Sequence, residues 1–329
     1  MAAACDLLEA EIALDRIDAE LAVELPPHMR AFAAAYAANT PVPAAPEVLR
    51  RGSTLRAIEM CRAHPVLADR VLAIARLAIP IAIEDDPRVI AARAAPSWDA
   101  LATLTAARDT AARERFGTGL FPLVHRLFGV GGAPPGTRDM PWPAPVEGWH
   151  DPRPSPLDPE TTWTELAARY GAEGRVDIVR GDRARTFVVE PGRHAIVVVP
   201  PLGSLASQFA LLHELGHALV ALLAPAGVPR VVDEAAASYI ARGIEHASEL
   251  AVHARRRRLQ LAEALDAIER GARAARPTDQ PPWALWHDPG AQAAYVEAEA
   301  IADRWCAEPG PLAAAIARER ARVDHSTSL

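Results

Sequence analysis

The chain has 329 residues, of which half are apolar and 23% are charged, and its net charge is -7. This composition excludes an intrinsically disordered chain, and the small negative charge gives no reason to expect a nucleic-acid partner. The three cysteines, Cys5, Cys61 and Cys306, lie far apart in the sequence. They therefore indicate neither a disulfide framework nor a structural zinc knuckle.

Residues 1–130 show the apolar periodicity of successive helices, with breaks expected at prolines such as the pair Pro26-Pro27. We interpret them as a helical N-terminal domain. Prolines and glycines are dense from residue 131 to residue 160, which predicts an extended connector that packs through Trp142 and Trp149. Residues 161–329 would form the second domain.

The second domain should contain a small sheet. Three runs rich in valine and isoleucine follow one another, at Arg175–Val179, Thr186–Glu190 and His194–Val199, and turn residues separate them. This pattern predicts a meander of hairpins and hence an antiparallel type of sheet. The C-terminal part is helical again, so the expected fold class is α+β, mostly α. The run Arg255–Arg258 is interpreted as a solvated helix face.

The most informative segment is His213-Glu214-Leu215-Gly216-His217. Residues four apart lie one above the other on a helix, so both histidines can bind a single ion at about 2.0 to 2.1 Å. Glu214 is rotated by roughly 100° from His213, which keeps it out of the coordination shell but beside the open ligand position. Ser204 as N-cap and Pro225 beyond the far end favour a helix here. The alternative is a pair of histidines that packs or caps a core helix.

A catalytic zinc site needs a third protein ligand. The metzincin arrangement would require a histidine at position 223, which is Leu223 in this chain. Glu234, seventeen positions after His217, lies in a second helical segment that can fold back towards the same ion. Asp233 is the competing ligand, and Glu245 and His246 are weaker candidates.

From His194 to Arg242 the chain resembles the gluzincin metallopeptidases, the thermolysin-like group in which a glutamate on the next helix completes the HExxH site. The resemblance implies a zincin-like catalytic domain with one Zn²⁺ per chain, bound by His213, His217 and Glu234, and Glu214 as general base. Many gluzincins have a histidine-orienting aspartate four residues after the ligand glutamate, where this chain has Ser238.

The order of sheet and motif helix also resembles the upper lobe of zinc peptidases. In those enzymes the last strand, here Ala195–Val199, lines the cleft and can pair with an extended substrate. The segment Trp286–Ala298 is loosely similar to a downstream helix of the thimet oligopeptidase and oligoendopeptidase branch, which places a tyrosine near the scissile carbonyl. The candidates for stabilising the oxyanion are, in this order, Tyr295, His287 and Tyr239.

The sequence therefore predicts a zinc-dependent peptidase that acts on a peptide or an unfolded protein segment. One alternative is a non-haem iron oxygenase that modifies peptides, because two histidines and a carboxylate also form that site. Another is a peptidase-like regulatory or binding module. The chain starts without a basic segment followed by an apolar one, and its longest apolar stretches are interrupted, so we expect a cytoplasmic protein without a membrane partner.

Overall fold

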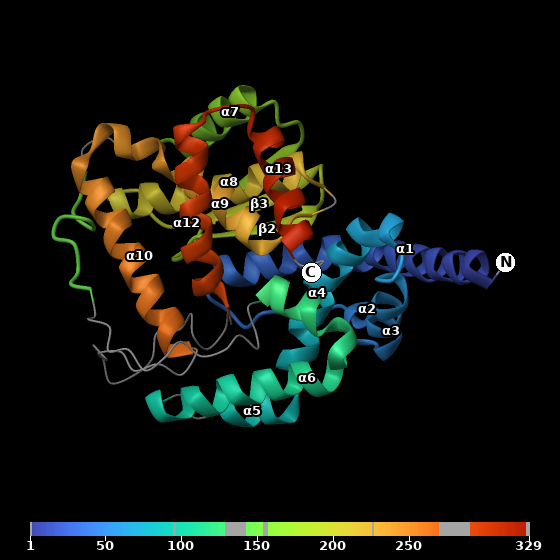
Figure 1. The fold of residues 1–329 in the computed structure, drawn as a ribbon. Coiled ribbons are helices and arrows are strands. Elements are labelled where there is room, and N and C mark those ends of the chain that lie inside the picture. Colours follow the sequence, from blue (N-terminus) through green and yellow to red (C-terminus); the bar gives the residue numbers. More distant parts are fainter. Residues whose placement is uncertain are drawn as a thin grey trace.

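The computed structural model describes residues 2–94, 97–128, 143–153, 157–225, 227–269 and 290–326. It is mostly helical with one three-stranded sheet (Figure 1), which confirms the α+β class. The first half contains α1 (Ala2–Ala37), α2 (Glu47–Arg50), α3 (Gly52–Cys61), η1 (Pro65–Leu67), α4 (Ala68–Glu84), α5 (Pro87–Arg93) and α6 (Trp98–Phe128). The second half contains α7 (Pro159–Tyr170), β1 (Arg175–Arg180), β2 (Arg185–Glu190), β3 (His194–Val199), α8 (Leu205–Leu223), α9 (Arg230–Ala241), η2 (Arg242–Ala247), α10 (Glu249–Glu269), α12 (Ala291–Ala307) and α13 (Leu312–Ser326).

Helix α1 continues through Pro26 and Pro27, so the break expected there is wrong. A proline inside a helix typically costs about 3 kcal/mol, because it removes a hydrogen bond and crowds the preceding turn. Here both halves of the helix are anchored by burial. Leu14 lies in the core of the N-terminal helices, whereas Ala33 lies in a separate cluster against the sheet. Packing at both ends offsets the local cost, and α1 thereby joins the two cores.

The strand order is β1-β3-β2, with β3 parallel to β1 and antiparallel to β2. The three predicted strands exist, but the sheet is mixed and the meander of hairpins is wrong. The reason is burial: five of the six residues of β3 are buried, whereas β1 is partly exposed along its length. The most apolar strand takes the centre although it comes last in the chain. Because β3 is paired along both edges, it cannot bind an extended substrate as expected for Ala195–Val199.

The sheet lies between α1 and α8. Alternate residues of a strand face opposite sides, so each strand can pack against both helices. Phe187 and Ile196 face α1 and belong to the cluster that contains Ala33. Val197 faces the other way and packs with Leu215 of α8. The HExxH helix is therefore held directly against the central strand.

Helices α8 and α9 approach each other closely at Gly216. A Cβ atom at this position would lie 2.5 Å from the Cα atom of Ala237 on α9, a separation that real Cβ atoms do not show. Glycine normally destabilises a helix interior by about 1 kcal/mol relative to alanine. This close contact is the physical reason for its presence, and it brings α9 within reach of the histidines.

The described part of the connector, residues 143–153, packs along the start of α8. Trp149 is buried and its ring lies 5.9 Å from that of Phe209. The backbone N–H of Arg153 donates to Gly203 O at 2.7 Å, and that of Ala206 donates to Trp149 O at 3.0 Å. Trp142 lies outside the described residues. The boundaries proposed at residues 130 and 160 stay predictions.

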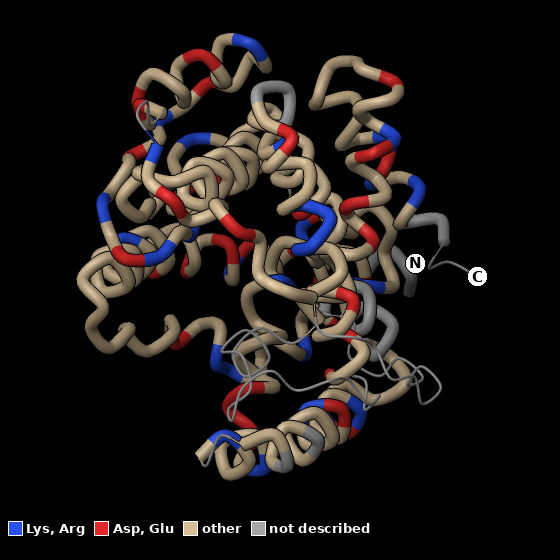
Figure 2. The backbone as a smooth tube through the Cα atoms, turned by 90° about the vertical axis from the view of Figure 1, so that its left-hand side faces the viewer, with Lys and Arg blue, Asp and Glu red and all other residues tan. Residues whose placement is uncertain are grey.

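Positive and negative residues are scattered along the described backbone (Figure 2), and the longest uninterrupted run of one sign is Arg255–Arg258. Within those regions, only α8 is long and apolar enough to cross a membrane. However, 61% of its most apolar window is buried inside the fold. We therefore interpret α8 as a core helix of the fold.

Candidate metal centre

Helix α8 begins with the N-cap that the sequence predicts. The Ser204 hydroxyl accepts a hydrogen bond from the Ser207 N–H at 3.2 Å, and the Ser207 hydroxyl accepts one from the Ser204 N–H at 3.1 Å. This reciprocal pair satisfies two donors at the helix start. The helix then ends at Leu223, two residues before Pro225. The two histidines of the motif lie on one face of this helix.

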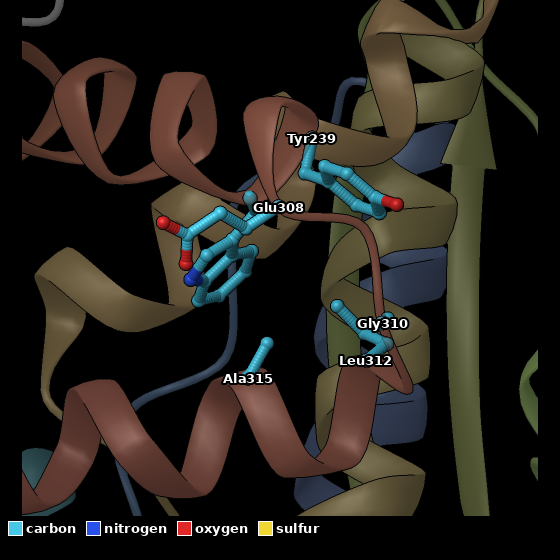
Figure 3. Close-up of a pocket in the computed structure, with 6 residues that line it drawn as sticks. Tyr239, Glu308, Gly310, Leu312 and Ala315 are labelled. Atoms are coloured by element: carbon cyan, nitrogen blue, oxygen red, sulfur yellow. The ribbon is translucent and has the colours of Figure 1, made fainter.

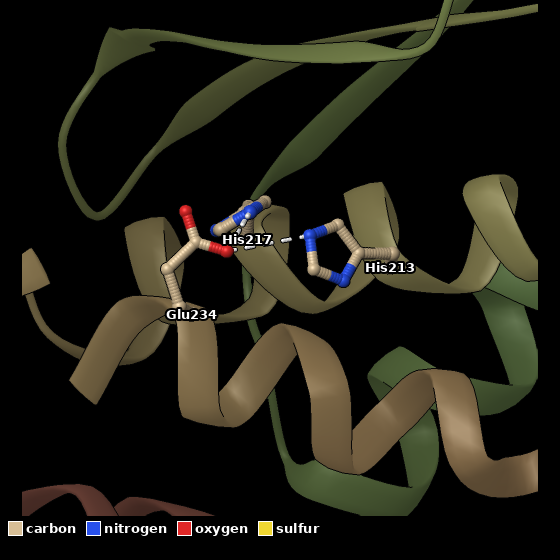
Figure 4. A group of neighbouring side chains, drawn as sticks. All are labelled: His213, His217 and Glu234. Atoms are coloured by element: carbon tan, nitrogen blue, oxygen red, sulfur yellow. Dashed lines mark ion pairs between the residues drawn. The ribbon is translucent and has the colours of Figure 1, made fainter. Parts of the chain in front are cut away.

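Glu234 of α9 points its carboxylate at both histidines (Figure 4). Its Oε2 atom lies 3.5 Å from His213 Nε2 and 3.8 Å from His217 Nε2. All three potential ligand atoms lie within 4.8 Å of one another. Ligands at about 2.0 to 2.1 Å from a tetrahedral ion are separated by roughly 3.4 Å, so the geometry fits one metal ion. These three residues form a candidate metal site.

The charges in this partly buried site favour a cation. Burial lowers the pKa of His217, but the charges of Asp233, Glu234 and Glu214 outweigh it and raise the pKa to about 10. Burial raises the pKa of the Glu234 carboxyl, because it disfavours the charged form. A hydrogen bond with His213 and the two imidazole charges outweigh this effect and lower the pKa to about 2. Negative charge thus collects around two imidazoles, where a divalent ion can replace a bound proton.

Asp233 orients His217 and does not join the triad. His217 Nδ1 donates to Asp233 Oδ1 at 3.0 Å, which leaves Nε2 facing Glu234. Arg76 of α4 donates to the other carboxylate oxygen of Asp233 at 3.1 Å. Such a partner fixes the orientation and tautomer of a metal-binding imidazole. The sequence offered Asp233 only as a competing ligand, and nothing in it indicated that Arg76 comes from the N-terminal helices to support it.

Glu214 is held from the sheet by Thr186 of β2. The Thr186 hydroxyl lies 2.7 Å from the Glu214 carbonyl oxygen and 2.8 Å from its Oε2 atom, so the two oxygens share its single O–H donor. Sequence reasoning missed this contact. The position of Thr186 in a predicted strand gave no indication that it would face α8.

Of the two oxyanion candidates that the structure describes, Tyr295 is the one that lies near the histidines. It lies on α12, its side chain is buried, and its ring centroid is 6.4 Å from that of His213. No described residue makes a hydrogen bond of good geometry with its hydroxyl, although the buried Glu299 carboxylate lies close enough to interact with it. Burial, partly offset by the charge of Arg258, raises the pKa of Tyr295 to about 12, so its hydroxyl remains a donor at neutral pH.

Tyr239 does not join this group. Tyr239 packs against Trp305, with ring centroids 6.0 Å apart, in a separate pocket that is also lined by residues between α12 and α13 (Figure 3). His287 lies outside the described residues. The side chains of Glu245 and His246 are likewise not described.

Comparison with models of known protein families finds none that matches this chain, and no curated protein matches it either. The interpretation of the site therefore depends on the geometry of its own residues.

Proposed function

We propose that this protein is a zinc-dependent peptidase that hydrolyses peptide bonds in a peptide or an unfolded protein segment. The main support is the position of Glu214. It lies next to His213 on α8, and Thr186 holds its carboxylate. A carboxylate in this place serves no purpose in a purely structural metal site, but it is needed to move a proton.

His213, His217 and Glu234 would hold the metal. Bound zinc would supply a Lewis acid that polarises the substrate carbonyl and lowers the pKa of water towards about 7. Glu214 would accept the proton of the attacking water and return it to the leaving amine. The Tyr295 hydroxyl would donate to the oxygen of the tetrahedral species, because its ring centroid lies 6.4 Å from that of His213 and its raised pKa keeps the proton on the hydroxyl.

An extended substrate would pair with β2. This strand is hydrogen-bonded to β3 on one side, and no described strand pairs with its other edge. Thr186 connects it directly to Glu214. Backbone pairing to a free sheet edge holds an extended chain without demanding a particular sequence. We also propose that the protein is cytoplasmic. The composition gives no reason to include a nucleic-acid or membrane partner.

The iron-oxygenase alternative shares the same three ligands. Such chemistry has no use for a general base beside the first histidine, and Glu214 with its Thr186 contact therefore favours hydrolysis. The identity of the metal separates the two classes.

The test combines metal analysis with cleavage of a quenched-fluorescence peptide library. Protein purified without added metal is measured by mass spectrometry, as wild type, His217→Ala and Glu214→Gln. We expect about one zinc per chain in the wild type, loss of zinc in His217→Ala, and retained zinc without cleavage in Glu214→Gln. Bound iron without cleavage would favour the oxygenase. Zinc in the wild type without any cleavage, or no metal at all, would favour a binding module.

A further inference from the structure

The guanidinium of Arg258 on α10 lies over two aromatic rings beside the metal site. Its central carbon is 4.1 Å from the centroid of Phe209 on α8 and 5.7 Å from that of Tyr295 on α12. Both rings adjoin His213, with centroid separations of 6.2 Å and 6.4 Å. Each of these two rings therefore lies between Arg258 and the candidate ligand His213. Helices α8, α10 and α12 contribute the residues of this cluster.

The four arginines Arg255–Arg258 do not form the solvated face expected from the sequence. Arg255 Nη1 donates to the buried carboxylate of Glu299 at 3.1 Å, and Arg257 Nη1 donates to Gln260 at 3.0 Å. Only Arg256 is exposed without such a described contact, whereas Arg258 is partly buried. The helix turns these consecutive residues in different directions, and one of them reaches the site.

In the parts of the chain that the structure describes, Arg255 has carboxylate partners, whereas no carboxylate forms an ion pair with Arg258, which differs from Arg256 and Arg257 by lying over the rings of Phe209 and Tyr295. Ring stacking stabilises a cation by about 0.5 to 2 kcal/mol, but it uses the face of the guanidinium and leaves the N–H donors at its edge free. A planar guanidinium with free edge donors matches a carboxylate, which it can bind through two parallel hydrogen bonds.

The positive charge of Arg258 can offset the negative charge around the histidines. Glu214, Asp233 and Glu234 surround the histidines and would repel a substrate carboxylate. Arg76 neutralises Asp233, and the metal would neutralise Glu234. Arg258 then adds a positive charge at the side of the site formed by Phe209 and Tyr295. Binding of an anionic substrate group is therefore favourable at that side.

We propose that Arg258 binds a carboxylate of the substrate and makes the enzyme selective for peptides that present one beside the scissile bond. This inference rests on the proposed peptidase function. The carboxylate is either the free C-terminus or an acidic side chain, since both offer the same pair of oxygens.

The experiment measures kcat and KM on matched peptides with zinc-loaded protein. One pair differs only in a free or amidated C-terminus, and further pairs exchange Glu for Gln at each position around the cleaved bond. We expect the wild type to prefer one carboxylate-bearing peptide by about 10- to 100-fold in kcat/KM, as for a charged hydrogen bond. The pair that shows this preference identifies the source of the carboxylate.

Arg258→Gln should lose this preference mainly through a higher KM for the carboxylate-bearing peptide, so that kcat/KM becomes similar for the two members of the pair. Arg258→Lys should restore part of it, because the charge remains but the planar pair of donors is lost. Arg257→Gln, one residue away and bonded to Gln260, serves as the matched control and should keep the wild-type preference. Zinc content and thermal unfolding of each variant show whether its fold and site are intact.

Two results would overturn the inference while leaving the peptidase intact: a wild type that cleaves both members of every pair equally, or an Arg258→Gln enzyme with an unchanged preference. If Arg258→Gln does not fold, Arg258→Lys carries the same comparison. Binding of the matched peptides to zinc-loaded Glu214→Gln, with and without Arg258→Gln, tests the carboxylate contact without turnover. Loss of carboxylate-dependent binding supports it even where cleavage fails, and unchanged binding contradicts it.

Discussion

His217 donates a hydrogen bond from Nδ1 to Asp233 Oδ1 at 3.0 Å, and Asp233 directly precedes the candidate ligand Glu234. Two adjacent residues of α9 thus act on the same site in different ways. Glu234 offers a carboxylate to the candidate metal site, and Asp233 fixes the imidazole of His217 beside it. Arg76 extends this contact to α4, so the N-terminal helices support the metal site.

Removing this support should weaken metal binding without removing a ligand. We expect Asp233→Asn and Arg76→Gln to lower zinc affinity by about 10- to 100-fold, as is typical when the partner of a metal-bound histidine is lost. Competition with a chromogenic chelator measures the affinity. Arg70→Gln, on the same helix but paired with Asp18, is the control and should bind zinc like the wild type. Equal losses of zinc affinity in Arg70→Gln and Arg76→Gln would mean that α4 affects the site only through the stability of the fold, and not through the contact between Arg76 and Asp233.

Thr186→Val should reduce turnover while leaving the metal in place. Valine keeps the shape of threonine but cannot donate to Glu214, so the general base would lose its orientation. We expect kcat to fall by about 10- to 100-fold, because a hydrogen bond to a charged group is typically worth about 1.5 to 3 kcal/mol. Steady-state kinetics and zinc content measure the two effects. Thr164→Val is the control, because the Thr164 hydroxyl donates to a backbone carbonyl within α7. It should change neither kcat nor zinc content.

Tyr295→Phe separates catalysis from stability. Loss of a donor to the oxyanion typically lowers kcat about 100- to 1000-fold. The free energy of unfolding should change by less than about 1 kcal/mol, because the buried Tyr295 hydroxyl makes no hydrogen bond of good geometry with a described residue. Kinetics and urea unfolding of the same preparation test both statements. Tyr239→Phe is the matched control and should retain full turnover, since Tyr239 packs against Trp305 instead. A fully active Tyr295→Phe enzyme would exclude the oxyanion role.

Gly216→Ala should destabilise the protein although alanine is the better helix former. The added methyl group would meet the Cα atom of Ala237 at 2.5 Å, so α8 and α9 must separate. Overpacking of this kind typically costs about 1 to 3 kcal/mol, more than the gain of about 1 kcal/mol in helix propensity. Separation of the helices also moves Glu234 away from the histidines, and zinc affinity should fall.

Urea unfolding and zinc titration measure these two consequences of Gly216→Ala. Gly52→Ala is the control, because nothing lies within 4 Å of a Cβ atom at that helical position. A Gly216→Ala protein as stable as the Gly52→Ala protein would show that the interhelical contact can relax at no cost.

The sequence by itself determined the local features. The spacing of His213 and His217, the cap at Ser204 and the alternation of apolar residues each depend on neighbouring residues, and so the motif helix and the three strands were predictable. Glu234 was within reach of the same reasoning, since one short loop separates its helix from the motif.

Only the tertiary structure decided how distant segments meet. The central place of β3 depends on which strand gains most from burial, and the continuity of α1 depends on two cores that lie far apart in the sequence. Arg76, Thr186 and Arg258 reach the site from three different elements, and no local pattern marks them. Their roles follow from packing, because a hydrogen bond or a stacked ring requires proximity that sequence spacing does not encode.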